Sequence, residues 1–474
     1  MTDAAATTND DAEEDLKRSI TGRLLFFYVV GDVLGSGIYA LIGLVAGSVG
    51  GAFWLAFALG VTIATFTGMA YAELATKYPR AAGAALYVNR AFGNPTLTFM
   101  VTVLFLASSF AAAGSLATGF ARYFAEVWEL PPGILVALVF ILLLAVVNYI
   151  GITESVVANM VMTFVEITGL LVVMLVGIIV IVQGDADFGV LVDFSAEGNP
   201  IFAVLAGISL AFFAMTGFEN AANVAEETVD PARNFPRALI GGMAVAGVFY
   251  VLVSIASALS VPIGDLADST TPLLDVVTSG ALPLPVDVLT IIFAIIAMTA
   301  ITNTTLVAIV TQPRILYGMA REDIVPAAFG KVHRTRRSPV LGLVFSAAVV
   351  MTLLVIGRVL QAVGVDVDVV ARLATVTVVL LLLIYTMVIV ACMKLGGTDV
   401  NADHYRAPRA LLVVGILGNI AVLVYTVVDD PASLIWCAGL VAVGVLLFLV
   451  EYFFGHRDRP HGARRGAGYD DKES

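Results

Sequence analysis

The feature that most constrains the fold of this chain is a succession of long apolar runs, separated by short clusters of charge. Of the 474 residues, 59% are hydrophobic and only 13% are charged, whereas soluble domains carry about a quarter charged residues. A transmembrane helix needs roughly 20 consecutive apolar residues. One such run can be a signal peptide or a buried helix, but about a dozen in succession predict an all-α integral membrane protein.

Apolar windows predict about twelve transmembrane helices, with boundaries good to a few residues. They are expected at 24–48, 52–76, 95–125, 131–150, 154–182, 198–225, 236–261, 284–320, 339–362, 370–394, 408–428 and 432–454. The stretch from Ala81 to Phe92 is predicted to form a short amphipathic or re-entrant segment. Residues 1–20 and 455–474 are polar, which predicts disordered ends.

Basic residues gather in alternate loops, and their distribution predicts the direction of insertion. Lys and Arg are enriched in the cytoplasmic loops of membrane proteins. Here they cluster within 17–23, 77–90, 233–237, 331–337, 394–409 and 457–465, and the intervening loops at 185–197, 265–275 and 429–430 are acidic. Both termini are therefore expected in the cytoplasm, in a multi-pass protein of the plasma membrane. The exceptions to this charge pattern are Arg122, Arg358 and Arg372.

Composition also excludes several classes of function. Cys392 and Cys437 are the only cysteines, and the four histidines all fall in polar segments, so neither a disulfide framework nor a metal or other cofactor is expected. The net charge of −12 argues against a nucleic-acid partner. Motifs of catalytic or phosphate-binding sites are missing from the sequence, so an enzyme is not expected. No obligatory protein partner is evident.

Two of the predicted helices carry glycine near their centres. The first span reads VVGDVLGSGIYALIG, with Gly35, Ser36 and Gly37 in its middle, and the sixth reads SLAFFAMTGFENAANVAEE, with Thr216 and Gly217. Glycine destabilises a helix interior by about 1 kcal/mol relative to alanine, so both helices are expected to break there. Interruptions at matching places in two halves of a chain indicate a transporter site near the midplane.

Such a break creates a site for a zwitterion. The N–H groups that begin the second half-helix favour an anion such as a carboxylate, and the carbonyls that end the first half-helix attract an ammonium group. The alternative is that these glycines only permit close packing of helices. The paired occurrence, followed in the sixth span by the buried Glu219, favours the binding site.

At these residues the sequence resembles the amino acid–polyamine–organocation (APC) superfamily of permeases. The resemblance is carried by GDVLGSGIYALIG, YAELATKYPRAAGAALYVNRAFG, FFAMTGFENAANVAEETVDPARNFPRAL and TNTTLVAIVTQPRILYGMARED, and it covers roughly residues 20–340. It implies a LeuT-type core of two inverted five-helix repeats, at 21–182 and 198–394, that works by alternating access. Two additional helices at 408–454 would follow this core.

The resemblance also implies the substrate-binding residues. They are Val33, Gly35, Ser36, Gly37, Ile38, Phe213, Ala214, Thr216 and Gly217. N–H groups at the start of the second half of the first span, with the Ser36 hydroxyl, would hold the substrate carboxylate. Carbonyls of Val33, Phe213, Ala214 and Thr216 would receive its amino group. Phe213 occupies the place of an aromatic gate, although a core or lipid-facing phenylalanine is the alternative.

Three carboxyl groups at membrane depth are candidates for ion coupling: Asp32, Glu166 and Glu219. Ionisable side chains inside a membrane are costly and therefore indicate function. Glu166 lies about twelve residues into its span, or roughly 18 Å at 1.5 Å per residue, near the midplane. Burial away from water favours the protonated carboxyl, which is the form that a proton carrier needs. Some proton-coupled relatives have a lysine near this position, so the glutamate puts lysine-based coupling in doubt.

Other assignments of these groups stay open. Sodium is the alternative coupling ion, held by Thr304 and Thr305 with carbonyls of the first helix, although such hydroxyls more often bond their own helix. Glu219 is as well explained by a hydrogen bond to the unwound backbone. Glu73 is expected at a cytoplasmic helix end, paired with basic loops in solvent.

The sequence therefore predicts secondary active uptake of an amino acid, driven by protons. The close alternatives are an amino acid/polyamine exchanger and a sodium-coupled carrier, and a channel or a membrane-embedded enzyme is more remote. The expected partners are the small-molecule substrate and membrane lipid.

Overall fold

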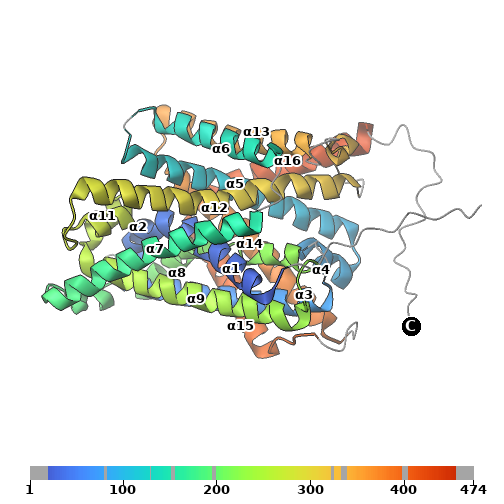
Figure 1. Ribbon diagram of the computed structural model, residues 1–474. Coiled ribbons are helices and arrows are strands. Elements are labelled where there is room, and N and C mark those ends of the chain that lie inside the picture. Colours follow the sequence, from blue (N-terminus) through green and yellow to red (C-terminus); the bar gives the residue numbers. More distant parts are fainter. Residues whose placement is uncertain are drawn as a thin grey trace, which may run out of the picture.

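The computed structural model describes residues 20–79, 83–128, 130–150, 155–194, 199–321, 325–332, 339–397 and 404–454. Long helices run side by side through one bundle, and α1, α2 and α8 lie near its centre (Figure 1). In the ranges given, ten helices are long and apolar enough to cross a membrane, and the bent pair α1–α2 makes an eleventh span. The predicted disordered ends lie outside the described residues, apart from Ile20.

The helices follow the predicted order. Their bounds are α1 Gly22–Leu34, α2 Ser36–Val49, α3 Trp54–Lys77, α4 Gly83–Phe92, α5 Pro95–Ala125, α6 Gly133–Ile150, α7 Ser155–Gln183, α8 Pro200–Ala214, α9 Pro231–Ser260, α10 Ile263–Asp268, α11 Pro272–Thr278, α12 Val286–Arg321, α13 Val340–Ala362, α14 Val369–Lys394, α15 Arg409–Asp429 and α16 Ser433–Phe454. Short 3-10 helices lie between them: η1 Gly51–Phe53, η2 Phe188–Val192, η3 Phe218–Val224, η4 Ala327–Gly330 and η5 Leu395–Gly397.

Each predicted span coincides with one long helix or with one interrupted pair. The predicted twelfth span is α16, which contains the apolar stretch Ser433–Leu447. The largest error at a helix start is in α9, which begins at Pro231 and not at 236. Proline suits the first turn of a helix because its missing N–H group has no partner there in any case. Pro231 therefore begins α9 and does not belong to the loop before it.

The short segment before the third span forms an amphipathic helix, which is one of the two forms predicted for it. In α4, Tyr87, Val88 and Ala91 are buried, and Asn89 and Arg90 are exposed. This helix packs against α5, α14 and η3. We refer to the end of the bundle that carries α4 and the start of α1 as the inner end.

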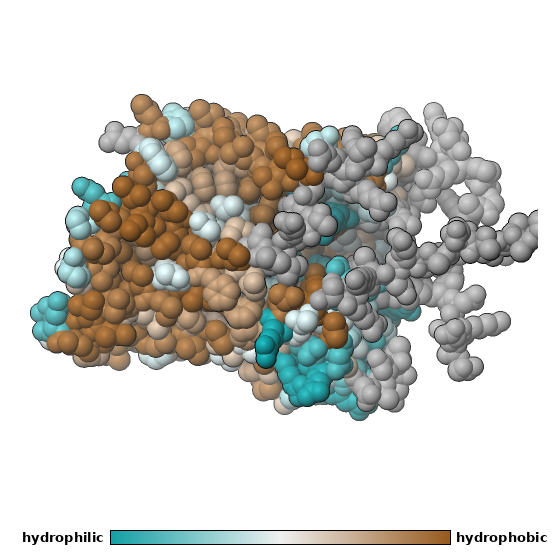
Figure 2. All heavy atoms as spheres, viewed as in Figure 1, coloured by the Kyte–Doolittle hydropathy of each residue, from teal (hydrophilic) through white to brown (hydrophobic). Residues whose placement is uncertain are grey.

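The outside of the bundle is suited to lipid. Large exposed hydrophobic side chains include Leu142 and Leu143 on α6 and Phe164 and Ile178 on α7. On the face shown in Figure 2 they form a broad hydrophobic area, and hydrophilic residues gather toward the ends of the molecule. Apolar surface of this extent on the outside of the helices belongs in a membrane.

Two of the three arginines that break the charge pattern are paired with aspartates. Arg122 on α5 donates to Asp368 at 2.9 Å, and Arg372 on α14 forms an ion pair with Asp430, just after α15. Arg358 is exposed on α13. These ion pairs neutralise Arg122 and Arg372 among the acidic loops. They lie at what we call the outer end, the end of the bundle opposite the inner end.

Helix α15 is attached to the core by polar contacts at membrane depth. The Asn419 amide donates to the Thr67 hydroxyl on α3 at 3.2 Å, and the hydroxyls of Thr426 and Ser209, on α8, lie 2.7 Å apart. Hydrogen bonds between helices replace the hydrophobic effect as a source of association where the surroundings are lipid. The sequence resemblance left this helix without a role, and the structure fixes it against α3 and α8.

Candidate functional site

The first transmembrane span is interrupted where the sequence predicts it. Helix α1 ends at Leu34, α2 begins at Ser36, and the two axes differ by 41°. Gly35 stands between them with φ −18° and ψ −161°, outside the helical region. The predicted break at Gly35–Gly37 is confirmed.

The sixth span is interrupted as well. Helix α8 ends at Ala214, and the chain turns through Met215 to Gly217 before it continues as the 3-10 helix η3. Gly217 has φ +117°, in the region that favours glycine because other residues carry a Cβ atom. The predicted break at Thr216–Gly217 is confirmed.

The two interruptions lie against each other. A Cβ atom on Gly217 would stand 2.6 Å from the carbonyl oxygen of Asp32, and one on Gly37 would stand 2.4 Å from the Cα atom of Ala214. A real Cβ atom does not come this close to another heavy atom, so both positions need glycine. These glycines therefore interrupt the helices and also let the interrupted segments touch, as the packing alternative requires, and a substrate-binding role for them stays a prediction.

The hydroxyl of Tyr250, on α9, lies between the carbonyl ends of the two broken helices. Its oxygen lies 2.7 Å from the carbonyl oxygen of Ala214, and it is also within hydrogen-bond distance of the carbonyl oxygen of Val33. One hydroxyl carries one proton, so it satisfies only one of these carbonyls at a time. The carbonyls of Val33 and Ala214, which are both predicted to receive an amino group, thus share one hydroxyl. That hydroxyl can donate to only one of them, so one carbonyl is left without a donor.

The remaining predicted groups are placed as follows. The Phe213 carbonyl accepts from the N–H group of Thr216 at 3.2 Å and from its hydroxyl at 2.8 Å, so the turn itself satisfies it. Ser36, Gly37 and Ile38 are the first residues of α2, whose N–H groups have no partner inside the helix. No side chain in the described ranges caps this helix start.

Phe213 is buried with 4% exposure, which excludes the lipid-facing alternative. Its part as a gate stays a prediction. Val33, Gly35, Gly37, Ile38, Ala214 and Gly217 are buried too, and Thr216 is partly exposed. The candidate site is therefore closed to solvent in this structure.

Glu219 stabilises the unwound backbone. Its carboxylate accepts from the N–H group of Gly217 at 2.9 Å and from the hydroxyl of Tyr385, on α14, at 2.7 Å. Asp32 accepts from the Asn220 amide at 3.0 Å through one oxygen, and its other oxygen has no partner in the described part of the chain. The alternative explanation of Glu219, a hydrogen bond to the unwound backbone, is confirmed.

Glu166 differs from both other carboxyl groups. It lies on α7 with 0% exposure, and neither of its oxygens has a hydrogen-bond partner among the described residues. The Asn303 side chain, on α12, is a potential donor close to this carboxyl, but its amide nitrogen forms no well-formed hydrogen bond with it, and Asp32 is within electrostatic range. An ionised carboxylate without partners is very costly in such surroundings, so the neutral carboxyl is favoured.

The two threonines of the sodium alternative, Thr304 and Thr305, have different surroundings. The Thr305 hydroxyl donates to the Ile301 carbonyl of its own helix at 2.7 Å. The Thr304 side chain lies at the break, since a Cβ atom on Gly35 would be 2.1 Å from its oxygen. In the described ranges, no group of three or more His, Cys, Asp and Glu side chains is arranged to hold a metal ion.

Four aromatic rings lie together beside Glu219, and we call them the aromatic cluster: Tyr71 on α3, Tyr87 on α4, Phe218 on η3 and Tyr385 on α14. Neighbouring ring centroids are 5.1 to 6.1 Å apart, and all four residues are buried. Sequence reasoning missed this cluster and Tyr250, because nothing in the sequence around each ring indicates which distant residues it will meet.

Solved structures with a similar arrangement of helices define the fold. The chain is similar to a mutant of the manganese transporter of Eremococcus coleocola, with a TM-score of 0.61 and 14% identity over 91% of this chain and 94% of that one. It is similar to MhsT in complex with L-phenylalanine, with a TM-score of 0.61 and 16% identity over 87% and 98%. The fold is thus the LeuT-type fold of secondary transporters.

The chain belongs to the amino acid permease family, whose sequence model matches residues 22–453. It is 23% identical to the branched-chain amino acid permease BcaP of Lactococcus lactis over 87% of this chain and 90% of that protein. It is 26% identical to cationic amino acid transporter 9, chloroplastic, of Arabidopsis thaliana over 65% of this chain, and it spans 56% of the length of that plant protein. The predicted family, APC-type amino acid permease, is confirmed.

The contact between the two breaks predicts the effect of Gly37→Ala. The added methyl group meets the Ala214 backbone, so we expect the affinity for an amino acid substrate to fall at least about tenfold, a change of ~1.4 kcal/mol. Binding to purified protein measures this. Gly60→Ala, on α3, is the control because nothing lies within 4 Å of its new Cβ atom. Equal affinity in the Gly37 variant and the control would contradict the proposed contact.

Tyr250→Phe tests the bridge between the carbonyls. The ring keeps its contact with Phe57, at 5.7 Å, but buried carbonyls lose their donor, so we expect a loss of about 1–3 kcal/mol of stability. Thermal unfolding in detergent measures it. Tyr87→Phe is the matched control, because its buried hydroxyl has no partner in the described structure, and we expect it to be neutral. Equal melting temperatures for the two variants would show that the Tyr250 bridge adds nothing.

Proposed function

We propose that this protein takes up an amino acid together with protons, by alternating access, with Glu166 as the group that carries the proton. The observation that carries the proposal is the isolation of Glu166, a fully buried carboxyl whose two oxygens lack partners in the described structure. Every other carboxyl near the site has at least one donor.

The binding mode follows from the two breaks. The substrate carboxylate would accept hydrogen bonds from the N–H groups that begin α2, at Ser36, Gly37 and Ile38. The ammonium group would bind the carbonyls of Val33 and Ala214, where it supplies the additional protons that the Tyr250 hydroxyl lacks. Gly35 and Gly217 would let the backbone turn at these points, and Phe213 would close over the substrate.

Proton binding and the position of α1 are coupled by electrostatics. Glu166 and Asp32 lie within electrostatic range of each other, and Asp32 is in the last turn before the break. Two neighbouring carboxyl groups cannot both be ionised at low cost. A movement of α1 therefore changes the affinity of Glu166 for a proton, and by linkage a bound proton changes the preferred position of α1.

The sodium-coupled alternative is less well supported. Of the two threonines it requires, Thr305 uses its hydroxyl within its own helix and only Thr304 lies at the break. An exchanger would use the same scaffold, and relatives named for cationic and for branched-chain amino acids leave the side chain of the substrate open. The basic loops at the inner end support a plasma-membrane protein with both termini in the cytoplasm.

Glu166→Gln tests the proposal because glutamine imitates the neutral carboxyl but binds no additional proton. We expect the variant to bind substrate and to exchange it across the membrane, and to lose accumulation driven by a pH gradient. The measurement is uptake into proteoliposomes with choline in place of sodium. The gradient-driven level should fall to the equilibrium level, a loss of about tenfold for a gradient of one pH unit.

The control is Asp287→Asn, at the first turn of α12 and exposed, which should accumulate substrate as the unmodified protein does. Accumulation by the Glu166 variant at the same pH gradient would exclude this glutamate as the proton carrier. Accumulation of the unmodified protein that depends on sodium would support the sodium-coupled alternative in its place.

A further inference from the structure

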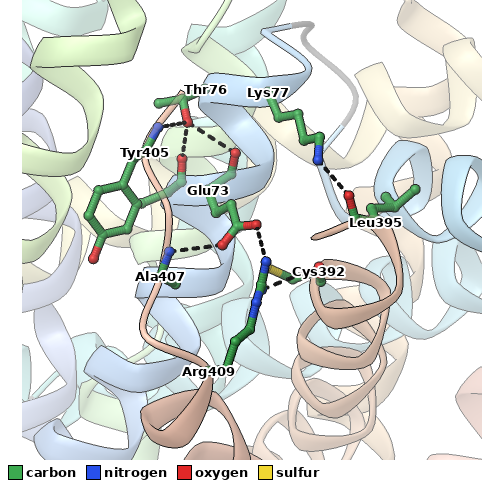
Figure 3. A network of polar contacts seen from close by, with 9 residues as sticks. Glu73, Thr76, Lys77, Cys392, Leu395, Tyr405, Ala407 and Arg409 are labelled. Atoms are coloured by element: carbon green, nitrogen blue, oxygen red, sulfur yellow. Dashed lines mark hydrogen bonds and ion pairs between the residues drawn. The ribbon is translucent and has the colours of Figure 1, made fainter. Parts of the chain in front are cut away.

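A largely buried network of polar and charged groups joins helix ends at the inner end of the bundle (Figure 3). We call it the inner network. It joins the end of α3, the end of α14 with η5, and the start of α15 through Glu73, Thr76, Lys77, Cys392, Leu395, Tyr405, Ala407 and Arg409.

The centre of the inner network is the carboxylate of Glu73. It is 1% exposed, and its Oε1 atom accepts from Nη2 of Arg409 at 2.8 Å while Oε2 accepts from the N–H group of Ala407 at 2.8 Å. The expectation of a solvated Glu73 is therefore wrong, although its basic partner does come from a cytoplasmic-type loop. The carboxylate can be buried because a cation and a backbone donor together replace its water.

The same arginine reaches a third helix. Its Nη1 atom lies 3.5 Å from the carbonyl oxygen of Cys392 and 3.6 Å from Sγ of that residue, near the end of α14. Lys77 on α3 donates to the Leu395 carbonyl at 2.5 Å, directly after α14. Arg409 and Lys77 thus hold the inner ends of α3 and α14 together.

These two helices also supply rings to the aromatic cluster. Tyr71 lies two residues before Glu73 on α3, and Tyr385 lies two helical turns before Cys392 on α14. The rings of Tyr71 and Tyr385 are 6.1 Å apart, and the Tyr385 hydroxyl donates to Glu219. Separation of the two helix ends would pull these rings apart and open the site at the inner end.

We propose that Glu73 and Arg409 are positioning residues for transport. Their ion pair holds α3 and α14 together and so keeps the aromatic cluster closed over the substrate site. The pair separates when the site opens at the inner end. This inference uses the alternating access of the proposed function, and it is independent of which ion drives transport.

The chain provides its own reporter and its own control. Cys392 is fully buried beside Arg409, and Cys437 is the other cysteine of the sequence. In a Cys437→Ala background, alkylation by N-ethylmaleimide therefore reports opening at Cys392. The ion pair of Arg372 and Asp430 also joins α14 to the end of α15, but at the outer end, so Asp430→Asn is a matched loss of a charge pair.

We expect Glu73→Gln, which keeps the volume of the side chain, to raise the rate of Cys392 alkylation at least about tenfold, because the buried Glu73 carboxylate is the group that holds Arg409, whose side chain is 41% exposed, beside Cys392. Asp430→Asn should leave the rate within about twofold, because that pair lies at the other end of the bundle, away from Cys392. Arg409→Lys keeps the charge and should lie between. For uptake from outside, KM should rise in Glu73→Gln, because fewer carriers face outward, while the maximal rate of exchange is kept.

Each outcome decides the matter. An unchanged alkylation rate in a Glu73→Gln protein that melts cooperatively would overturn the inference, and so would an equal increase in Asp430→Asn, since that would indicate general loosening. If Glu73→Gln does not fold, Arg409→Lys at the rate of the unmodified protein with unchanged KM would overturn it as well. None of these results bears on the Glu166 experiment, which tests the proposed function separately.

Discussion

The structure depends on the contact between two interrupted helices in the middle of the bundle. Unsatisfied backbone groups are very costly at membrane depth, so a broken helix persists only where neighbours complete it. Here the turn at Gly217 lies on the backbone of Asp32, and the start of α2 lies on Ala214. Each break thereby shields the other from lipid, and both leave polar groups directed to the same small volume.

The polar side chains around this contact divide by how well they are satisfied. Glu219 and Tyr250 serve the unwound backbone, one as an acceptor for an N–H group and the other as a donor between two carbonyls. Glu166 serves no backbone group. A fully bonded carboxylate stabilises one conformation, whereas an unbonded one changes its protonation as its surroundings change. This difference makes Glu219 a structural residue and Glu166 the candidate for coupling.

Closure of the site is distributed over helices that contribute no substrate ligand. Helix α15 lies outside the repeats, yet it contacts α3 and α8 through Thr67 and Ser209 and supplies Arg409 to the inner network. Because α3 and α14 also carry rings of the aromatic cluster, the proposed role of the Glu73–Arg409 pair connects α15 to the opening of the inner end.

The sequence by itself determined the spans, the two breaks and the family. This was possible because a membrane requires a helix of defined length wherever the chain crosses it, and glycine weakens a helix at its own position, so both signals are local. Only the tertiary structure decided that Tyr250 joins Val33 to Ala214, that Glu73 is buried against Arg409, and that Glu166 is left without a partner in the described residues. Glu73 and Arg409 stand 336 positions apart in the chain. Contacts over such separations depend on how the helices rotate and pack, and hydropathy along one helix carries no record of the neighbour that it will meet.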